Sequence, residues 1–245
     1  MFLLEGLPAV LLGVVTYFFL DDGPGKATWL SEGEKQTLLK QLAEDSDGQG
    51  TGQTHESLRQ AFLSARVWRL ALVYFCLALG LYGVSFWLPQ IVHDLKQGGL
   101  LVTGLLSAIP YLIAVLVMVG VAHSSDMSQE RRWHIAFSTV MGGVGLVTLA
   151  LVRGNAFLSI AALGLATSGI LSGLSTFWTL PTAFLSGRAA AGGIALINSI
   201  GNLGGYFGPF ILGWIKQTYG NLDAGLYLLA GILFLAGMLV VSASR

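Results

Sequence analysis

Long apolar runs alternate with short polar breaks along most of the chain. Each run reaches about 20 residues, which is the length an α-helix needs to cross the hydrocarbon core of a bilayer. The pattern therefore predicts an all-α membrane protein with seven transmembrane helices. Their expected ranges are residues 2–20, 68–92, 100–122, 133–152, 156–180, 189–215 and 224–243.

One polar segment, residues 21–66, is much longer than the other breaks. Ser31 and Glu34 form the S-x-x-E pattern of a helix N-terminus, and leucines follow at helical spacing. We therefore expect an amphipathic helix at residues 31–44 that lies along the membrane surface. Residues 45–54 have little to bury and are expected to form a flexible linker. Such a link suggests a boundary between two helical bundles; the alternative is an ordinary variable loop.

Composition supports a membrane protein. Hydrophobic residues make up 54% of the 245 positions and charged residues 11%, and the mean hydropathy is +0.71. These values lie far outside the range of soluble globular proteins. The formal net charge is zero and Cys76 is the single cysteine, so neither a nucleic-acid partner nor a disulfide framework is indicated. The start of the chain also lacks the basic region and A-x-A site of a cleavable signal peptide.

Basic residues predict the orientation, because cytoplasmic loops of membrane proteins are enriched in Lys and Arg. One side of the predicted topology holds ten of the 13 basic residues and the other side holds three. We expect the richer side and the C-terminus to be cytoplasmic, which leaves Met1 outside. This start is awkward for a complete protein, so we expect helices that precede Met1 to be missing. The cytoplasmic set is Lys26, Lys35, Lys40, Arg59, Arg66, Arg69, Arg131, Arg132, Arg188 and Arg245, and the outer set is Lys96, Arg153 and Lys216.

The segment 188–216 combines glycines with two amides. Asn198 and Asn202 are four residues apart and share a helical face. An amide in a bilayer is costly unless it meets a partner or lines a wet cavity, so this face is expected to point inward. A nearby stripe of glycines is expected to admit another backbone; its members are Gly201, Gly205 and Gly208.

Two other helices carry candidate ligand-binding groups. Tyr82 shares a face with Phe86, and its hydroxyl could orient a ligand. The alternative is that this region is a kinked helix with aromatic residues at its outer interface. We favour this alternative for Trp87. In the helix at 156–180, hydroxyls recur on one side, which Trp178 continues. Such serines can instead bond back to a carbonyl of the preceding turn, and we expect this of the first two. The hydroxyl-bearing residues are Ser168, Ser172 and Ser175.

Several motifs together resemble one family. They read FLLEGLPAVLLG, WLSEGEK, YFCLALGLYGVSFWLPQIV, AHSSDMSQERRWH and ALINSIGNLGGYFGPFILGWIK. The chain is similar to the C-terminal part of a major facilitator superfamily transporter, and more narrowly to the anion:cation symporters of tartrate, sugar acids, phthalate and similar organic anions. The resemblance implies two six-helix bundles with the substrate site between them. Residues 1–20 would be the last helix of the first bundle, 21–66 the cytoplasmic central loop, and 67–245 the second bundle.

The resemblance also implies roles for particular residues. The segment 122–132 corresponds to a short cytoplasmic motif in which Asp126, Arg131 and Arg132 would form a conformational latch, although Ala122, Met127 and Gln129 depart from the family pattern. The alternative is that the two arginines only satisfy the orientation rule. Ser175 and Trp178 together with Asn198 would contribute to the substrate site. With the residues chosen from the pattern, the candidate substrate-binding set is Tyr82, Ser175, Trp178, Asn198 and Asn202.

The charged groups of a symporter are not found in the apolar centres of the helices at 68–243. Proton coupling needs a titratable group, and an anion is best held by arginine. Glu5 is the one acid inside a predicted span, so we expect the charged groups to lie in the missing first bundle. No catalytic residue, cofactor or metal site is expected, including at His123, Asp126 and His134, and the expected coupling ion is a proton.

Three classes of function remain to be compared. A seven-helix receptor fits the outer N-terminus, but the last helix has no retinal-binding lysine and the long polar segment is ill placed. A membrane-embedded enzyme lacks a suitable cluster of acid, base and nucleophile. A secondary transporter fits best, so we expect half of a proton-coupled uptake system for a small organic anion in a plasma (inner) membrane. The alternative is a receptor or assembly partner that does not transport.

Overall fold

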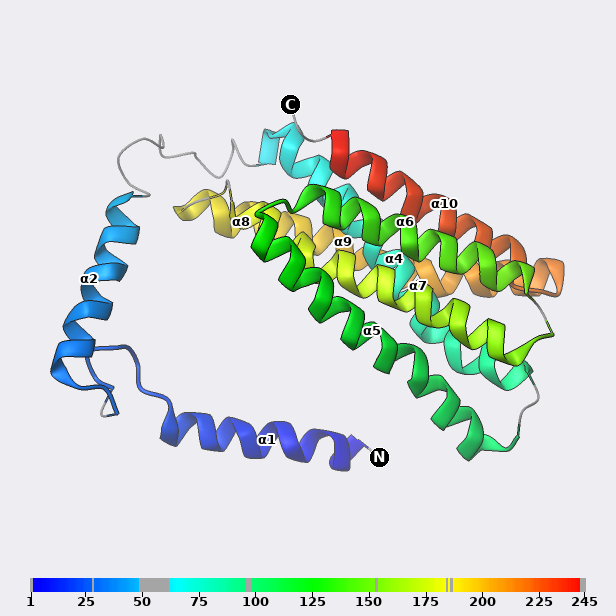
Figure 1. Cartoon of the computed structure of the whole chain (residues 1–245), viewed down its shortest axis with the longest axis horizontal. Coiled ribbons are helices and arrows are strands. Elements are labelled where there is room, and N and C mark those ends of the chain that lie inside the picture. Colours follow the sequence, from blue (N-terminus) through cyan, green and yellow to red (C-terminus); the bar gives the residue numbers. More distant parts are fainter. Residues whose placement is uncertain are drawn as a thin grey trace. The chain divides into compact units, whose positions relative to one another are not determined.

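The computed structural model of this protein describes residues 2–27, 29–48, 62–95, 98–152, 154–183, 185 and 187–242. Within these residues the secondary structure is helical and contains no strand. The chain divides into two compact units, Met1–Thr54 and His55–Arg245. The division falls inside the polar segment in which the sequence suggested a boundary. Figure 1 shows the helices of each unit.

The first unit contains two helices, α1 (Phe2–Phe19) and α2 (Glu32–Gly48). The predicted capping pattern of α2 is confirmed: the hydroxyl of Ser31 donates to Glu34 Oε2 over 2.7 Å, and the Ser31 amide donates to the same oxygen over 3.0 Å. The predicted linker began too early, because α2 continues through Gly48. The remainder of that expected linker lies outside the described residues.

The second unit is a bundle of long helices whose bounds follow the predicted spans within a few residues, except at the ends of α5 and α9. The helices are α4 (Ala65–Asp94), α5 (Leu100–Ser128), α6 (Arg132–Leu151), α7 (Ala156–Phe177), the short α8 (Thr179–Thr182), α9 (Gly187–Tyr219) and α10 (Asp223–Ser242). Five helices in the described part are long and apolar enough to cross a membrane; they start at Ala65, Leu100, Arg132, Ala156 and Asp223. The other two predicted spans, residues 2–20 and 189–215, are also helical. The first corresponds to α1, whose apolar stretch is shorter, and the second to α9, which is 33 residues long.

Two helices form the centre of the bundle. α4 packs along α9 and also contacts α10 and α7, whereas α7 packs against α6 and α5. Large aliphatic side chains fill the space between them and are almost completely buried. Examples from five helices are Leu77, Leu146, Ile170, Leu212 and Leu233.

Glycines allow two helix pairs to approach backbone to backbone. At the α6–α7 contact, a side chain on Gly169 would overlap the backbone of Gly142. At the α4–α9 contact, a Cβ on Gly208 would lie 2.5 Å from the carbonyl oxygen of Leu79. Small residues are what permits such close packing of helices in membranes.

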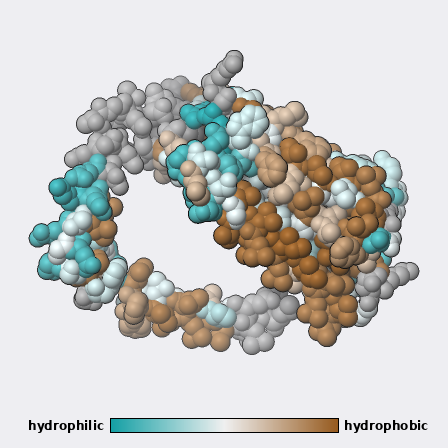
Figure 2. All heavy atoms as spheres, viewed as in Figure 1, coloured by the Kyte–Doolittle hydropathy of each residue, from teal (hydrophilic) through white to brown (hydrophobic). Residues whose placement is uncertain are grey.

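The sides of the bundle are apolar. α5 illustrates this, because only Pro110, Ala114 and Ser125 are buried along its 29 residues. Figure 2 shows the resulting hydrophobic surface over this part of the bundle. Continuous apolar patches of this size are not stable in water, so the chain is a multi-pass membrane protein. The large exposed side chains of α5 include Leu101, Leu105, Leu112 and Leu116.

The two ends of the bundle carry different loops. A guanidinium N–H of Arg69 donates to the Ser242 carbonyl over 3.4 Å, so the start of α4 lies beside the end of α10. The α5–α6 turn lies at this same end (Figure 1). At the opposite end, the Lys216 ammonium on α9 lies 3.8 Å from the Asp94 carboxylate on α4. This grouping agrees with the predicted topology, while the end that faces the cytoplasm remains a prediction.

Candidate functional site

Two tyrosines of α4 lie directly on glycines of α9. The ring of Tyr74 occupies the space in which a side chain on Gly201 would lie, and a Cβ on Gly205 would be 3.1 Å from the ring of Tyr82. The predicted glycine stripe therefore needs correction. Gly201 and Gly205 receive aromatic rings, whereas close backbone approach occurs at Gly208 and at Gly204, which the prediction omitted.

An aromatic cluster extends this contact from α9 to α7. The ring centroid of Tyr74 lies 4.9 Å from that of Trp178 and 5.4 Å from that of Phe177. Tyr74 thus links the predicted site residue Trp178 with the glycine beside Asn202. Tyr74 was not among the residues predicted from the sequence, although it lies about two helical turns before Tyr82 and therefore on nearly the same face of α4.

The two asparagines share a helical face, as their spacing predicted, and in addition they bond to each other. The Asn202 side-chain amide donates to both the carbonyl oxygen and the side-chain oxygen of Asn198, each over 2.9 Å. Both residues are exposed on the surface of the bundle. They therefore point away from the core of this bundle, and the inward direction expected for them requires a second body against this face.

The serines of α7 behave differently from the prediction. The Ser175 hydroxyl donates to the Ser172 carbonyl over 3.0 Å, which is the bond to the preceding turn that we expected of the earlier serines. The hydroxyls of Ser168 and Ser172 are instead buried without a hydrogen-bond partner in the described part of the chain. Ser175 is exposed, one turn before Trp178. Tyr82 is exposed as well, so the members of the predicted set other than the half-buried Trp178 lie on open surface.

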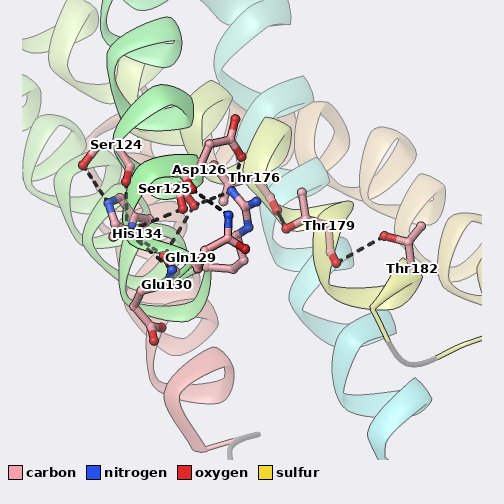
Figure 3. A network of polar contacts seen from close by, with 11 residues as sticks. Ser124, Ser125, Asp126, Gln129, Glu130, His134, Thr176, Thr179 and Thr182 are labelled. Atoms are coloured by element: carbon pink, nitrogen blue, oxygen red, sulfur yellow. Dashed lines mark hydrogen bonds and ion pairs between the residues drawn. The ribbon is translucent and has the colours of Figure 1, made fainter. Parts of the chain in front are cut away.

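Two of the three residues of the predicted latch are paired at the turn between α5 and α6, while the latch itself stays a prediction. Arg131 pairs with the Asp126 carboxylate and also donates to the Ser125 hydroxyl over 3.1 Å. Arg132 contributes its backbone N–H, which donates to Glu130 Oε1 over 3.1 Å. Figure 3 shows the acidic side chain of Asp126 and the neighbouring serines in this network.

The segment expected to be a polar loop is largely helical. α5 continues through Ser128, so Asp126 lies on the helix, and Gln129 ends it in a left-handed conformation with φ 53°. The Gln129 amide donates to the Asp126 carbonyl over 2.7 Å. The start of α6 is capped by Glu130, which accepts from the N–H groups of Arg132 and Trp133. Glu130, and not Asp126, therefore accepts from the first N–H groups of α6.

Near the same turn, His134 has a structural environment. Its Nε2 lies 3.0 Å from the Ser124 hydroxyl, and its Nδ1 faces the Glu130 carbonyl (Figure 3). These contacts link the start of α6 to the end of α5. These two contacts give His134 a structural role at the turn.

Comparison with known proteins decides the family. The sequence profile of the Major Facilitator Superfamily matches residues 1–209. The chain belongs to this superfamily. The resemblance indicated by the sequence motifs is thereby confirmed.

Relatives of this facilitator chain carry several names. A protein of Agrobacterium vitis, provisionally named a tartrate transporter, is 43% identical over 247 residues, which are 100% of this chain and 54% of the relative. The quinolone resistance transporter of Acinetobacter baumannii is 38% identical, over 98% of this chain and 55% of its own length. The inner membrane transport protein RhmT of Escherichia coli is 34% identical, with 98% and 55% covered. The chain spans about half the length of these relatives.

Proposed function

We propose that this chain is the C-terminal bundle, with the preceding helix and the central loop, of a proton-coupled symporter for small organic anions. The observation that carries the proposal is the wall formed by Trp178, Tyr74 and the paired asparagines of α9. The half-buried ring of Tyr74 on α4 contacts the ring of Trp178 and lies against Gly201 of α9, and the bonded asparagines are exposed on α9. A relative named for tartrate transport supports an organic anion as the substrate.

The wall is suited to orienting a ligand. Aromatic faces offer apolar contact, and amide groups can both donate and accept hydrogen bonds. In this assignment Trp178 and Tyr82 contact the body of the substrate, while Ser175, Asn198 and Asn202 bond its polar groups. The arginine that grips the carboxylate and the acid that carries the proton belong to the absent bundle.

The pair of Asp126 and Arg131 acts as the conformational latch in this proposal. Their side chains hold the end of α5 to the turn before α6, at the end of the bundle that we assign to the cytoplasm. Loss of the pair would shift the balance between the two orientations of the transporter. The protein would reside in the plasma (inner) membrane with its C-terminus inside.

Complementation of two halves tests the proposal. The chain is produced in bacteria that cannot take up tartrate, either alone or together with the first half of the Agrobacterium vitis relative. We expect proton-dependent uptake of labelled tartrate or a sugar acid with both halves only. Sequencing upstream of the Met1 codon is the companion measurement, since five further apolar spans in frame would supply the missing bundle. Uptake that stays at background with a correctly inserted, associated pair would contradict the proposal.

A second candidate function follows from another relative. The protein named a quinolone resistance transporter shares 38% identity with the chain, and an aromatic wall would also suit a planar aromatic substrate. The same cells can be tested for reduced norfloxacin accumulation. Reduced accumulation without organic-anion uptake would favour export over the symport we propose.

A further inference from the structure

A cavity of about 280 Å³ lies at the end of the bundle that carries Asp94, away from the α5–α6 turn. The ends of α4, α6 and α9 and the first turns of α7 and α10 surround it. Its floor is apolar, with Leu149, Leu222 and Leu226 each nearly buried. Its volume is close to the lower end of the range for small-molecule sites, about 300–1,000 Å³.

Among the residues that the structure describes, the rim of this cavity carries one positive and one negative side chain. The Lys216 ammonium lies 3.8 Å from Asp94 Oδ2. Charge-assisted hydrogen bonds are about 2.7–2.9 Å long, so no such bond joins the two groups. Each therefore keeps hydrogen-bonding capacity for a third group. The side chains are 32% and 54% exposed, which places both within reach of a solute.

Neighbouring residues hold both charges in position. The Lys216 ammonium lies over the Trp87 ring, 4.9 Å from its centroid, and the Trp87 N–H donates to the Pro209 carbonyl over 3.3 Å. On the other side, the Gln90 amide donates to Asp94 Oδ1 over 2.7 Å, which leaves Oδ2 directed to Lys216. Trp87 was interpreted from the sequence as an interfacial aromatic residue, and here it also supports the lysine.

We infer that this cavity binds a compact zwitterion with an apolar side chain, such as a branched-chain amino acid. The carboxylate of the ligand would pair with Lys216, its primary ammonium with Asp94, and its side chain with the leucine floor. An anion without an ammonium group would be attracted by Lys216 but repelled by Asp94. A cation without an anionic group would be attracted by Asp94 but repelled by Lys216. The matched pair of charges favours a ligand that carries both.

The same chemistry occurs in a lipid headgroup, because phosphatidylethanolamine also joins an ammonium to an anionic group. Binding is therefore measured in nanodiscs that contain the full chain in phosphatidylcholine, with and without phosphatidylethanolamine. L-leucine is titrated by calorimetry, and the controls are 4-methylpentanoate and 3-methylbutylamine, which lack one charge each. Leucine binding that disappears when phosphatidylethanolamine is present would identify the lipid headgroup as the occupant of the zwitterion site.

We expect saturable leucine binding and at least about tenfold weaker binding of both single-charge analogues, as befits hydrogen bonds to charged groups. Lys216→Gln and Asp94→Asn should weaken leucine binding by a similar factor, and Lys216→Arg should weaken it less. Ser159→Leu, which places a larger side chain at the cavity, should abolish binding. Lys40→Gln on α2 and Asn202→Ala in the proposed substrate wall should leave it unchanged. These last controls separate the inference from the proposed transport function.

Two results would overturn the inference. One is the absence of saturable leucine binding in both lipid mixtures. The other is unchanged affinity in Lys216→Gln, which would leave the lysine, aspartate and tryptophan as a contact that only joins α4 to α9. Lys216 is partly exposed, so this variant is expected to fold even if Ser159→Leu does not, and equal elution volume and far-UV circular dichroism verify it.

Discussion

The ring of Tyr74 on α4 fills the space above Gly201 on α9, and its centroid lies 4.9 Å from that of Trp178, the residue that follows α7. One side chain therefore connects the two helices that hold most of the predicted substrate-binding residues. The contact depends on the absence of a side chain at position 201.

The first prediction concerns this contact. Gly201→Ala would put a methyl group into the Tyr74 ring, including its Cγ, so the ring must leave its present position. Overpacking of this kind costs about 1–3 kcal/mol. We expect a lower midpoint of thermal unfolding in detergent, measured by intrinsic fluorescence. The matched control is Gly231→Ala on α10, where a Cβ meets nothing within 4 Å. An equal change in both variants would contradict the assigned contact.

The second prediction concerns the contact between α6 and α7. Gly169→Ala would drive a methyl group into the backbone at Gly142 and Ser138, which cannot rotate away as a side chain can. We expect a larger loss of stability than in Gly201→Ala, at or above the upper end of the range of about 1–3 kcal/mol. The measurement is the fraction of folded protein after heating, followed by size-exclusion chromatography. Gly104→Ala on α5 is the control, because its Cβ would lie in open space.

The third prediction separates a latch from a stabilising ion pair. Asp126 is 66% exposed and Arg131 24% exposed as side chains, so removing the pair should change the free energy of unfolding by roughly 0–1 kcal/mol. Asp126→Asn in the assembled transporter should nevertheless alter substrate uptake clearly. The double exchange Asp126→Arg with Arg131→Asp should restore part of it. A loss of uptake that matches the loss of stability in both variants would argue against a latch.

The fourth prediction concerns the aromatic and amide wall. Trp178→Ala and Asn198→Ala, made in the assembled transporter, should reduce uptake about tenfold, equivalent to about 1.4 kcal/mol. Membrane insertion should remain intact because both positions are at least partly exposed. Phe157→Ala, which truncates an exposed ring elsewhere on α7, is the control. Normal uptake in both test variants would remove the site assignment.

The fifth prediction concerns the cap of α2. The hydroxyl of Ser31, followed by its backbone N–H, donates to the Glu34 carboxylate and lowers the pKa of Glu34. A lowered pKa means that the cap contributes fully above the ordinary pKa of glutamate and is lost as the pH falls through the lowered value. Ser31→Ala should therefore raise the pKa of Glu34, measured by carbon-13 NMR of labelled glutamate. Glu32 serves as the internal reference. An unchanged pKa of Glu34 in this variant would contradict the capping bond.

The sequence by itself determined the class, the positions of the helices and the family. Runs of about 20 apolar residues must satisfy their backbone polar groups within helices when they enter a bilayer, so the approximate positions of the helices follow from the hydropathy pattern. The capping pattern at Ser31 and the pairing of Asn198 with Asn202 were also predictable. Both depend on residues three or four positions apart on one helix, and such contacts are local.

The tertiary structure alone decided which residues meet across helices. Periodicity predicted a glycine stripe on α9 but not the groups that pack against each glycine. Aromatic rings pack against Gly201 and Gly205, whereas the backbone of α4 packs against Gly204 and Gly208. It also could not say that Arg131, and not its neighbour in sequence, reaches Asp126. The rotation and relative height of two packed helices depend on all the side chains between them. That information is distributed over the whole bundle, and no single helix contains it.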